Sequence, residues 1–240
     1  MKERLRHTGV RQRSLRMVEL VGPAGAGKTT LARALSQSSG KIVVAPDISL
    51  RKVKCIPTFV HSVLLLLPIF LRRCRCGRWF TWDEIKAMAY LKGWPRIFQQ
   101  QAAESETIIL LDHGPVFKLA TLHAFGPDRL RTPVAEKWWS DMCKQWASLL
   151  DMVIWLDATD PILEKRINAR DQRHAVKGKP EPEALRFLAR YRASYQQILA
   201  KLTANGGPTL YQFDTSQTSI EQIAENVLAA CDIESPGSRE

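Results

Sequence analysis

The chain of 240 residues is short of acidic residues, of cysteine and of long apolar runs. Its 24 Asp and Glu stand against 35 Lys and Arg, which gives a formal net charge of +11. Such an excess of cations suits partners that are polyanions, either nucleic acid or small phosphorylated molecules. The basic residues are concentrated in the first sixteen residues and in 51–54, 72–78 and 165–179. The last three groups flank the places where the motifs below predict bound phosphates, so small molecules are favoured and nucleic acid is not expected as a partner.

The five cysteines are odd in number and follow no disulfide pattern. Cys74 and Cys76 are close in sequence, but no second cysteine or histidine pair stands at the spacing of a zinc site. We therefore expect neither disulfides nor a zinc site, and a reduced, cytoplasmic setting. Residues 1–14 are basic and lack the apolar core of a signal peptide, so a solvated tail is expected there, and another at 234–240.

The longest apolar run, residues 60–71, has about a dozen residues and is interrupted by Pro68, whereas a spanning helix needs about 20. We expect this run to be a buried helix of an inserted subdomain. Because arginines follow it, contact of residues 60–78 with a membrane surface stays open as an alternative.

The motif around which the chain is organised is Gly-Pro-Ala-Gly-Ala-Gly-Lys-Thr-Thr at residues 22–30, which fits the phosphate-binding pattern G-x-x-x-x-G-K-[ST]. Its glycines let successive backbone N–H groups point at a phosphate, and Lys28 adds a positive charge that reaches the β- and γ-phosphates. Thr29 is the expected magnesium ligand. The predicted nucleotide-binding residues are Gly22, Ala24, Gly25, Ala26, Gly27, Lys28, Thr29 and Thr30.

Five short apolar stretches that we expect to be strands alternate with helical patterns along the chain: 15–21, 41–45, 107–111, 152–156 and 209–213. This alternation predicts an α/β fold of three layers, a five-stranded parallel sheet with helices on both faces. Residues 15–233 are expected to form one domain, with a helical insert at 48–104. In the insert, Thr81 and Glu84 form a capping box, and Gly93 with Pro95 is expected to end that helix before a shorter one over 96–104.

Asp112 follows the third predicted strand at the sheet edge where ligands of such folds bind, which predicts that it holds magnesium. Asp160 is the expected N-cap of a helix on which Arg166, Arg170 and Arg173 recur at i, i+4 and i+7 and so project from one side. A second capping box, Thr218 with Glu221, is expected to begin the last helix.

Four segments together resemble P-loop small-molecule kinases, nearest to the thymidylate-kinase-like nucleotide kinases: residues 22–30, the strand that ends at Asp112, the stretch 157–177 and the closing strand with Asp214-Thr215-Ser216. The resemblance implies the P-loop NTPase fold, ATP and Mg²⁺ as cofactors, and transfer of the γ-phosphate to a small molecule. It also implies a basic lid over about 166–181 whose Arg166, Arg170 and Arg173 act on the transferred phosphate with Lys28 and Asp112. Thr215 would then lie against the adenine.

Two departures from the family leave the acceptor open. His113 stands where thymidylate kinases usually have arginine, and Ala45-Pro46-Asp47 stands where they have a Glu-Pro-Gly turn. The acceptor is a nucleoside monophosphate or another molecule with a hydroxyl or phosphate. Asp47, Arg51 and Arg96 are the candidates for binding it, because they fall in the interval that holds the family's acceptor site.

An NTP-binding regulatory or nucleic-acid-associated ATPase stays open as the alternative function. The sequence has no Asn-Lys-x-Asp loop of a switch GTPase and no Leu-Ser-Gly-Gly signature of a transporter ATPase. Both absences favour the kinase. A homodimer also stays open.

Overall fold

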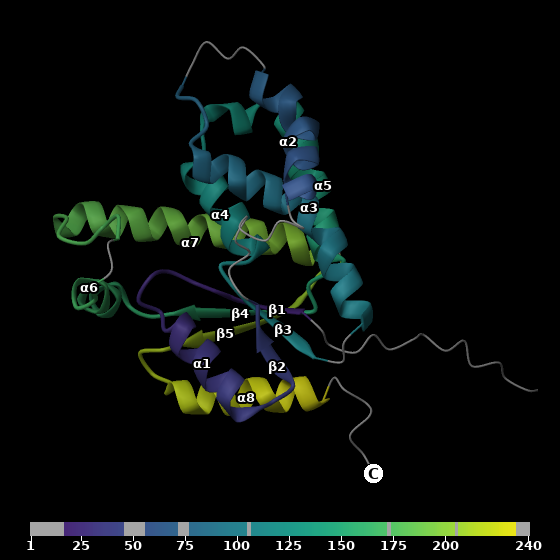
Figure 1. Cartoon of the computed structure of the whole chain (residues 1–240). Helices are drawn as coiled ribbons and strands as arrows, with labels where there is room; N and C mark the ends of the chain where they lie inside the picture. The colour runs from purple at the N-terminus through teal and green to yellow at the C-terminus, as the bar shows by residue number, and fades with distance from the viewer. Residues whose placement is uncertain are drawn as a thin grey trace, which may run out of the picture.

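The computed structural model in Figure 1 describes residues 17–45, 56–71, 77–104, 107–171, 174–204 and 206–233, and the structural statements below concern these residues. Its centre is a sheet of five parallel strands in the order β2-β3-β1-β4-β5. The strands are β1 (Met17–Val21), β2 (Ile42–Val44), β3 (Ile108–Asp112), β4 (Met152–Asp157) and β5 (Thr209–Asp214). The predicted α/β fold with a five-stranded parallel sheet is confirmed.

The sheet is covered on both faces, which explains why β1, β3 and β4 are mostly apolar, whereas the edge strand β5 is largely exposed and contains Thr209 and Gln212. Side chains alternate along β1, so Met17 and Val21 join one buried cluster while Val18 and Leu20 join the other. Figure 1 shows α1 (Lys28–Ser38) and α8 (Ile220–Ile233) below the sheet, and α4 (Pro115–Phe125) and α7 (Glu181–Thr203) above it.

The insert consists of α2 (Ile56–Leu71) and α3 (Trp82–Glu104) and packs with α5 (Pro133–Ala147) at the end of the molecule remote from α8 (Figure 1). The prediction that Gly93 and Pro95 end a helix is wrong, because α3 is continuous through both. Pro95 has no N–H for the carbonyl of Leu91, but the indole Nε1 of Trp146 donates to that oxygen at 3.0 Å. A Cβ on Gly93 would lie 2.5 Å from Ser62 Oγ, so glycine lets α2 approach α3 closely.

The helix α2 is only half buried, which corrects the expectation of a buried helix. Ser62, Leu66, Ile69 and Phe70 are buried, whereas the opposite face is exposed. None of the helices within the described ranges is long and apolar enough to cross a membrane.

Of the three helix N-caps predicted from the sequence, the structure confirms one. Thr81 and Glu84 form the predicted capping box, with Thr81 N donating to Glu84 Oε2 at 2.8 Å and Glu84 N donating to Thr81 Oγ1 at 3.3 Å. The last helix is capped by Ser219 rather than Thr218, since the Ser219 hydroxyl accepts the Gln222 N–H at 3.2 Å.

The helix α6 (Asp160–Asn168) has Thr159 rather than Asp160 at its N-cap. It ends before Arg170, so the expected helix with three arginines along one side is wrong. The predicted tails, 1–14 and 234–240, lie outside the described residues.

Candidate active site

The phosphate-binding motif forms the turn between β1 and α1, at the carboxyl edge of the sheet. Gly22 has φ 136°, and a Cβ there would lie 1.9 Å from the carbonyl oxygen of Leu156, so the loop runs tight against β4. Gly27 has φ 95° and is the N-cap of α1. The free N–H groups and the positive dipole end of α1 therefore open toward the site, which is the arrangement that binds phosphate.

Most of the predicted motif residues line one cavity of about 320 Å³: Gly22, Ala24, Gly25, Gly27, Lys28 and Thr29. Ala26 is fully buried in the core instead, and Thr30 is exposed on α1.

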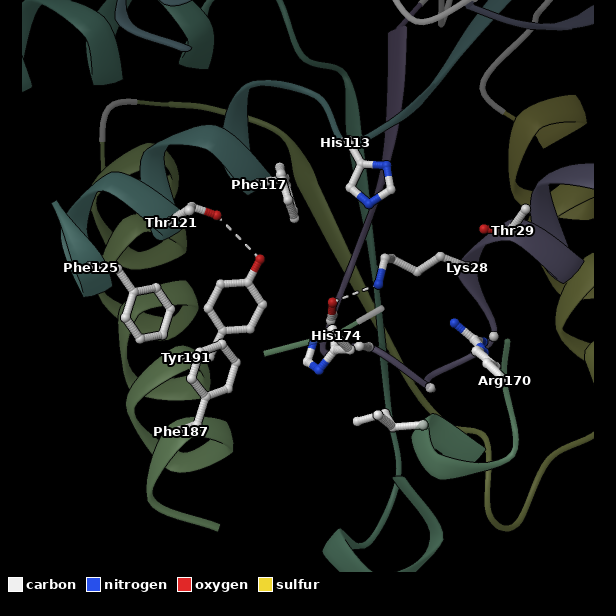
Figure 2. A pocket seen from close by; sticks show the side chains of 15 residues that line it. Lys28, Thr29, His113, Phe117, Thr121, Phe125, Arg170, His174, Phe187 and Tyr191 are labelled. Carbon is white, nitrogen blue, oxygen red and sulfur yellow. Dashed lines mark hydrogen bonds between the residues drawn. The ribbon is translucent and has the colours of Figure 1, made fainter. Parts of the chain in front are cut away.

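Lys28 is folded back onto its own loop, and its Nζ donates to the carbonyl oxygens of Gly22 at 2.8 Å and Pro23 at 2.9 Å. Figure 2 shows the side chain reaching into the cavity. Burial lowers the pKa of Lys28 to about 8, with the charge of Asp112 opposing this shift and that of Arg170 adding to it. An incoming phosphate would favour the charged amine.

Asp112 and Thr29 come together beside Lys28. Asp112 is the last residue of β3 and pairs with Leu20 of β1, which places it next to the loop. The Thr29 hydroxyl donates to Asp112 Oδ2 at 3.2 Å. Asp112 Oδ1 is buried and accepts no hydrogen bond from any described residue, although His113 Nδ1 lies 3.5 Å away.

This donor set fits magnesium. Mg²⁺ prefers oxygen ligands and is usually bound by one or two carboxylates together with substrate phosphates, and the buried, unpartnered carboxylate oxygen beside a threonine hydroxyl provides such ligands. Within the described ranges no group of three His, Cys, Asp or Glu side chains is placed to hold a metal. A magnesium ion held by Thr29 and Asp112 would complete its coordination with phosphate oxygens and water.

The wall of the cavity opposite the loop is aromatic. It consists of Phe117 and Phe125 on α4 and Phe187 and Tyr191 on α7. Phe125 and Phe187 stack at 4.6 Å, and the hydroxyl of Tyr191 lies 3.3 Å from that of Thr121. Figure 2 shows these rings on one side of the cavity and Lys28, Thr29 and Arg170 on the other. A ligand there meets apolar surface at one end and cations at the other.

His174 lies between these two sides of the cavity (Figure 2). Burial and the nearby charges of Lys28 and Arg170 lower the pKa of His174, which favours the neutral ring. Its Nδ1 accepts the N–H of Val176 at 3.3 Å, which leaves the proton on Nε2.

Glu19, which the sequence analysis did not consider, holds the start of the helix that carries Phe117. It is fully buried on β1, and its two oxygens accept the N–H groups of Val116 and Phe117, each at 2.9 Å. Burial raises the pKa of Glu19 to about 8, against the opposing effects of both hydrogen bonds and of Lys118. A charged residue within the apolar stretch Met-Val-Glu-Leu-Val was the available signal. Glu19 caps α4 and so positions Phe117 at the cavity.

The predicted lid arginines separate in the structure. Arg166 donates from Nη1 to Gly25 O at 3.2 Å and to Thr215 Oγ1 at 2.9 Å, and from Nη2 to Thr215 O at 2.9 Å. It therefore ties the phosphate loop to the turn after β5. Thr215 is buried and does not line the cavity. Arg170 does line the cavity, and Arg173 lies outside the described residues.

Of the three acceptor candidates, the structure describes only Arg96. Arg96 is exposed on α3 and lines neither the first cavity nor a second one of about 310 Å³, and Asp47 and Arg51 lie outside the described residues. The second cavity shares Phe117 and Thr121 with the first and extends it toward aromatic side chains of the insert: Phe59, Tyr90 and Trp94.

The sequence analysis also gave no role to Arg192 of α7. It donates to both carboxylate oxygens of Asp157, at 2.8 and 3.0 Å, to Asp160 Oδ1 at 2.5 Å and to Ala158 O at 2.9 Å. This network holds α7, and with it Phe187 and Tyr191, to the turn after β4.

No protein-family model matches the chain, and no curated protein matches its sequence. Solved structures do match, and they give the class of fold: it is that of the P-loop nucleotide kinases, resembling thymidylate kinase.

Three of these structures define the likeness. Thymidylate kinase from Candida albicans has a TM-score of 0.56 at 14% identity, over 92% of each chain. The YorR protein of Bacillus subtilis, in complex with phosphorylated GDP, has a TM-score of 0.51 at 17% identity, over 91% of this chain and 96% of its own. Deoxyadenosine kinase from M. mycoides, with dCMP and dCDP, has a TM-score of 0.51 at 15% identity, over 90% and 99%. At these identities the likeness shows the fold.

Proposed function

We propose that the protein is an ATP-dependent phosphotransferase that moves the γ-phosphate to a small acceptor. The observation that carries the proposal is the first cavity, which has a phosphate loop, Lys28 and Arg170 on one side and an aromatic wall on the other. The aromatic wall offers stacking surface for a flat acceptor placed opposite the phosphate loop.

In the proposed reaction the bond between the γ-phosphorus and the β,γ-bridging oxygen breaks, and a bond forms from that phosphorus to an acceptor oxygen. The bridging oxygen leaves with ADP, and an acceptor hydroxyl releases its proton to water. Such transfers depend on positioning and on neutralising charge rather than on covalent catalysis. The N-terminus of α1 and Lys28 would hold the β- and γ-phosphates, and Arg170, on the same side of the cavity, would add positive charge near the migrating group. Thr29 and Asp112 would hold Mg²⁺, which neutralises phosphate charge when bound. Arg166 is best placed to act indirectly, by fixing the loop at Gly25.

The acceptor class that fits the aromatic wall is a nucleoside or nucleoside monophosphate. Flat aromatic groups stack on Phe and Tyr rings, and the second cavity extends the apolar surface beyond Phe117. The structural neighbours support this class, since they include a thymidylate kinase and a deoxyadenosine kinase. Asp47 remains a prediction for orienting or deprotonating an acceptor hydroxyl, and Arg51 for holding an acceptor phosphate.

The test is to measure ADP formation from ATP and magnesium with separate pools of nucleosides, nucleoside monophosphates, sugars and small alcohols. We expect one of the nucleoside-based pools to stimulate ADP formation, and Lys28→Ala to reduce the stimulated rate by at least about 100-fold, because it removes a charge that acts on the transition state. Lys137→Ala, at an exposed lysine of α5, is the matched control and should behave as wild type.

Two outcomes contradict the proposal. If no pool raises ADP formation above a slow, Lys28-dependent background, the alternative of a regulatory ATPase replaces it. If sugars or alcohols are the only acceptors, the phosphotransferase stands but the nucleoside class is wrong.

A further inference from the structure

Three hydroxyl groups form a chain that ends in the aromatic wall of the first cavity. The Tyr195 hydroxyl donates to that of Tyr191 at 3.3 Å, and the Tyr191 hydroxyl lies 3.3 Å from that of Thr121. Figure 2 shows the Thr121 and Tyr191 hydroxyls pointing toward each other on the aromatic side of the cavity. Tyr195 is fully buried, whereas Thr121 and Tyr191 both line the cavity. These last two residues therefore form the end of the chain that a ligand would meet.

The phosphate loop sets the direction of this chain. Burial raises the pKa of Tyr195 well above its usual value, and the backbone of Gly22 opposes that shift with a hydrogen bond. A hydrogen bond that favours the phenolate comes from a donor, so the Gly22 N–H donates to the Tyr195 hydroxyl. Tyr195 in turn gives its own hydrogen to Tyr191. Tyr191 therefore accepts at this contact and keeps its hydrogen for another partner.

A count of hydrogens shows that Thr121 and Tyr191, which we call the hydroxyl pair, have one hydrogen to spare. Burial raises the pKa of Tyr191, so both hydroxyls of the pair carry a hydrogen at neutral pH. Their mutual contact uses one of these two hydrogens, whichever residue donates it. Within the described part of the chain, the hydroxyl pair has no hydrogen-bond partner besides Tyr195. One hydroxyl hydrogen is thus left at the wall of the cavity, where a ligand can accept it.

We propose that the hydroxyl pair selects the acceptor by donating a hydrogen bond to the edge of its ring. The ligand class is a flat ring that carries a carbonyl oxygen or an unprotonated ring nitrogen, as a nucleobase does. Any flat ring can stack on the aromatic wall, but a ring without such an atom would cover the spare hydroxyl and leave it unsatisfied, which disfavours binding. This inference rests on the proposed function, because it places the acceptor in the first cavity.

The test is calorimetric titration of the full chain, without ATP, with the deoxynucleosides of adenine, guanine, cytosine and thymine and their 5′-monophosphates. The phenyl C-nucleoside and its 5′-monophosphate serve as ligands whose ring stacks but has no acceptor atom. We expect at least one natural ligand to bind, about tenfold more tightly than its phenyl counterpart. Thr121→Val with Tyr191→Phe removes both hydroxyls, and should weaken the natural ligand by about tenfold and the phenyl ligand by less than about twofold. Thr121→Ser keeps a hydroxyl and should bind as wild type.

The matched control is Thr203→Val with Tyr211→Phe, which makes the same two changes at positions that line neither cavity and should bind as wild type. The inference is overturned if no natural ligand binds the wild-type chain, or if the variant without the hydroxyl pair binds it as tightly as the control. It is also overturned if that variant loses the phenyl ligand equally, because the change is then one of packing. A ligand that binds through the hydroxyl pair but is never phosphorylated contradicts the phosphotransferase alone.

Discussion

Glu19 makes stability depend on pH in a direction that its burial determines. Its pKa is raised from 4.5 to about 8, so the folded protein keeps this carboxyl protonated at pH values where the unfolded chain has released the proton. The folded state therefore binds more protons than the unfolded state between these two values. The stabilising contribution of Glu19 protonation is therefore fully present below about pH 4.5 and is lost as the pH rises through 8.

The size of the effect follows from the shift. One pKa unit corresponds to about 1.4 kcal/mol, so between pH 6 and pH 9 Glu19 should lower the free energy of unfolding by about 2 to 3 kcal/mol. In Glu19→Gln this contribution disappears, because an amide does not titrate. The amide still accepts one of the two N–H groups of α4, but it presents a donor to the other, so the variant should be less stable than wild type at pH 6.

The assay is urea unfolding of wild type and Glu19→Gln at pH 6, 7, 8 and 9, with Glu225→Gln, an exposed glutamate of α8, as the control. The stability difference between wild type and Glu19→Gln should shrink by about 2 to 3 kcal/mol across this range. Lys28, whose pKa is lowered to about 8, gives the opposite trend, but it is common to both proteins and cancels in the difference. A difference that stays constant within about 0.5 kcal/mol would refute the reasoning about burial.

Two further predictions concern the framework of the site. Arg192→Met should lower the free energy of unfolding at pH 7 by about 2 kcal/mol in urea titrations, because it leaves two partly buried carboxylates unpaired. Arg186→Met, at an exposed position of the same helix, should cost less than about 0.5 kcal/mol, and an equal loss in both variants would contradict the role of the network. Gly22→Ala should abolish nucleotide binding in calorimetry and lower Tm, because its Cβ would meet the Leu156 carbonyl at 1.9 Å. Gly40→Ala, which meets nothing within 4 Å, should leave both unchanged.

The strands were predictable because their physical signal is local. A strand buried on both faces is apolar throughout, and β4, Met152–Asp157, differs from its predicted range by one residue. The capping box of Thr81 and Glu84 was predictable for the same reason, since both partners lie within four residues. The phosphate loop was also predictable from a local signal, because its glycines and Lys28 are close together in sequence.

The helix ends were harder to predict because tertiary contacts override local preferences. Pro95 would end an isolated helix, because it leaves the Leu91 carbonyl without a partner. The Trp146 indole donates to that carbonyl, and Trp146 is 55 residues from Leu91 in sequence. The periodic arginines of the predicted lid suggested a longer helix, whereas α6 ends at Asn168 and Arg166 turns toward Thr215. Spacing alone cannot distinguish an arginine that faces a substrate from one that holds a loop.

The aromatic wall shows why an acceptor site is less visible in sequence than a phosphate loop. Phosphate is bound mainly by backbone N–H groups, which must be contiguous and therefore leave a motif. The wall is assembled from α4 and α7, whose contributing residues are separated by more than 60 positions, and each of its side chains taken alone resembles an ordinary core residue. Two polar groups that hold these helices, the buried Glu19 under α4 and the partly buried Arg192 on α7, distinguish the wall from core packing. An unexpected charge within an apolar stretch, such as Glu19, is therefore a better guide to such a site than the aromatic residues themselves.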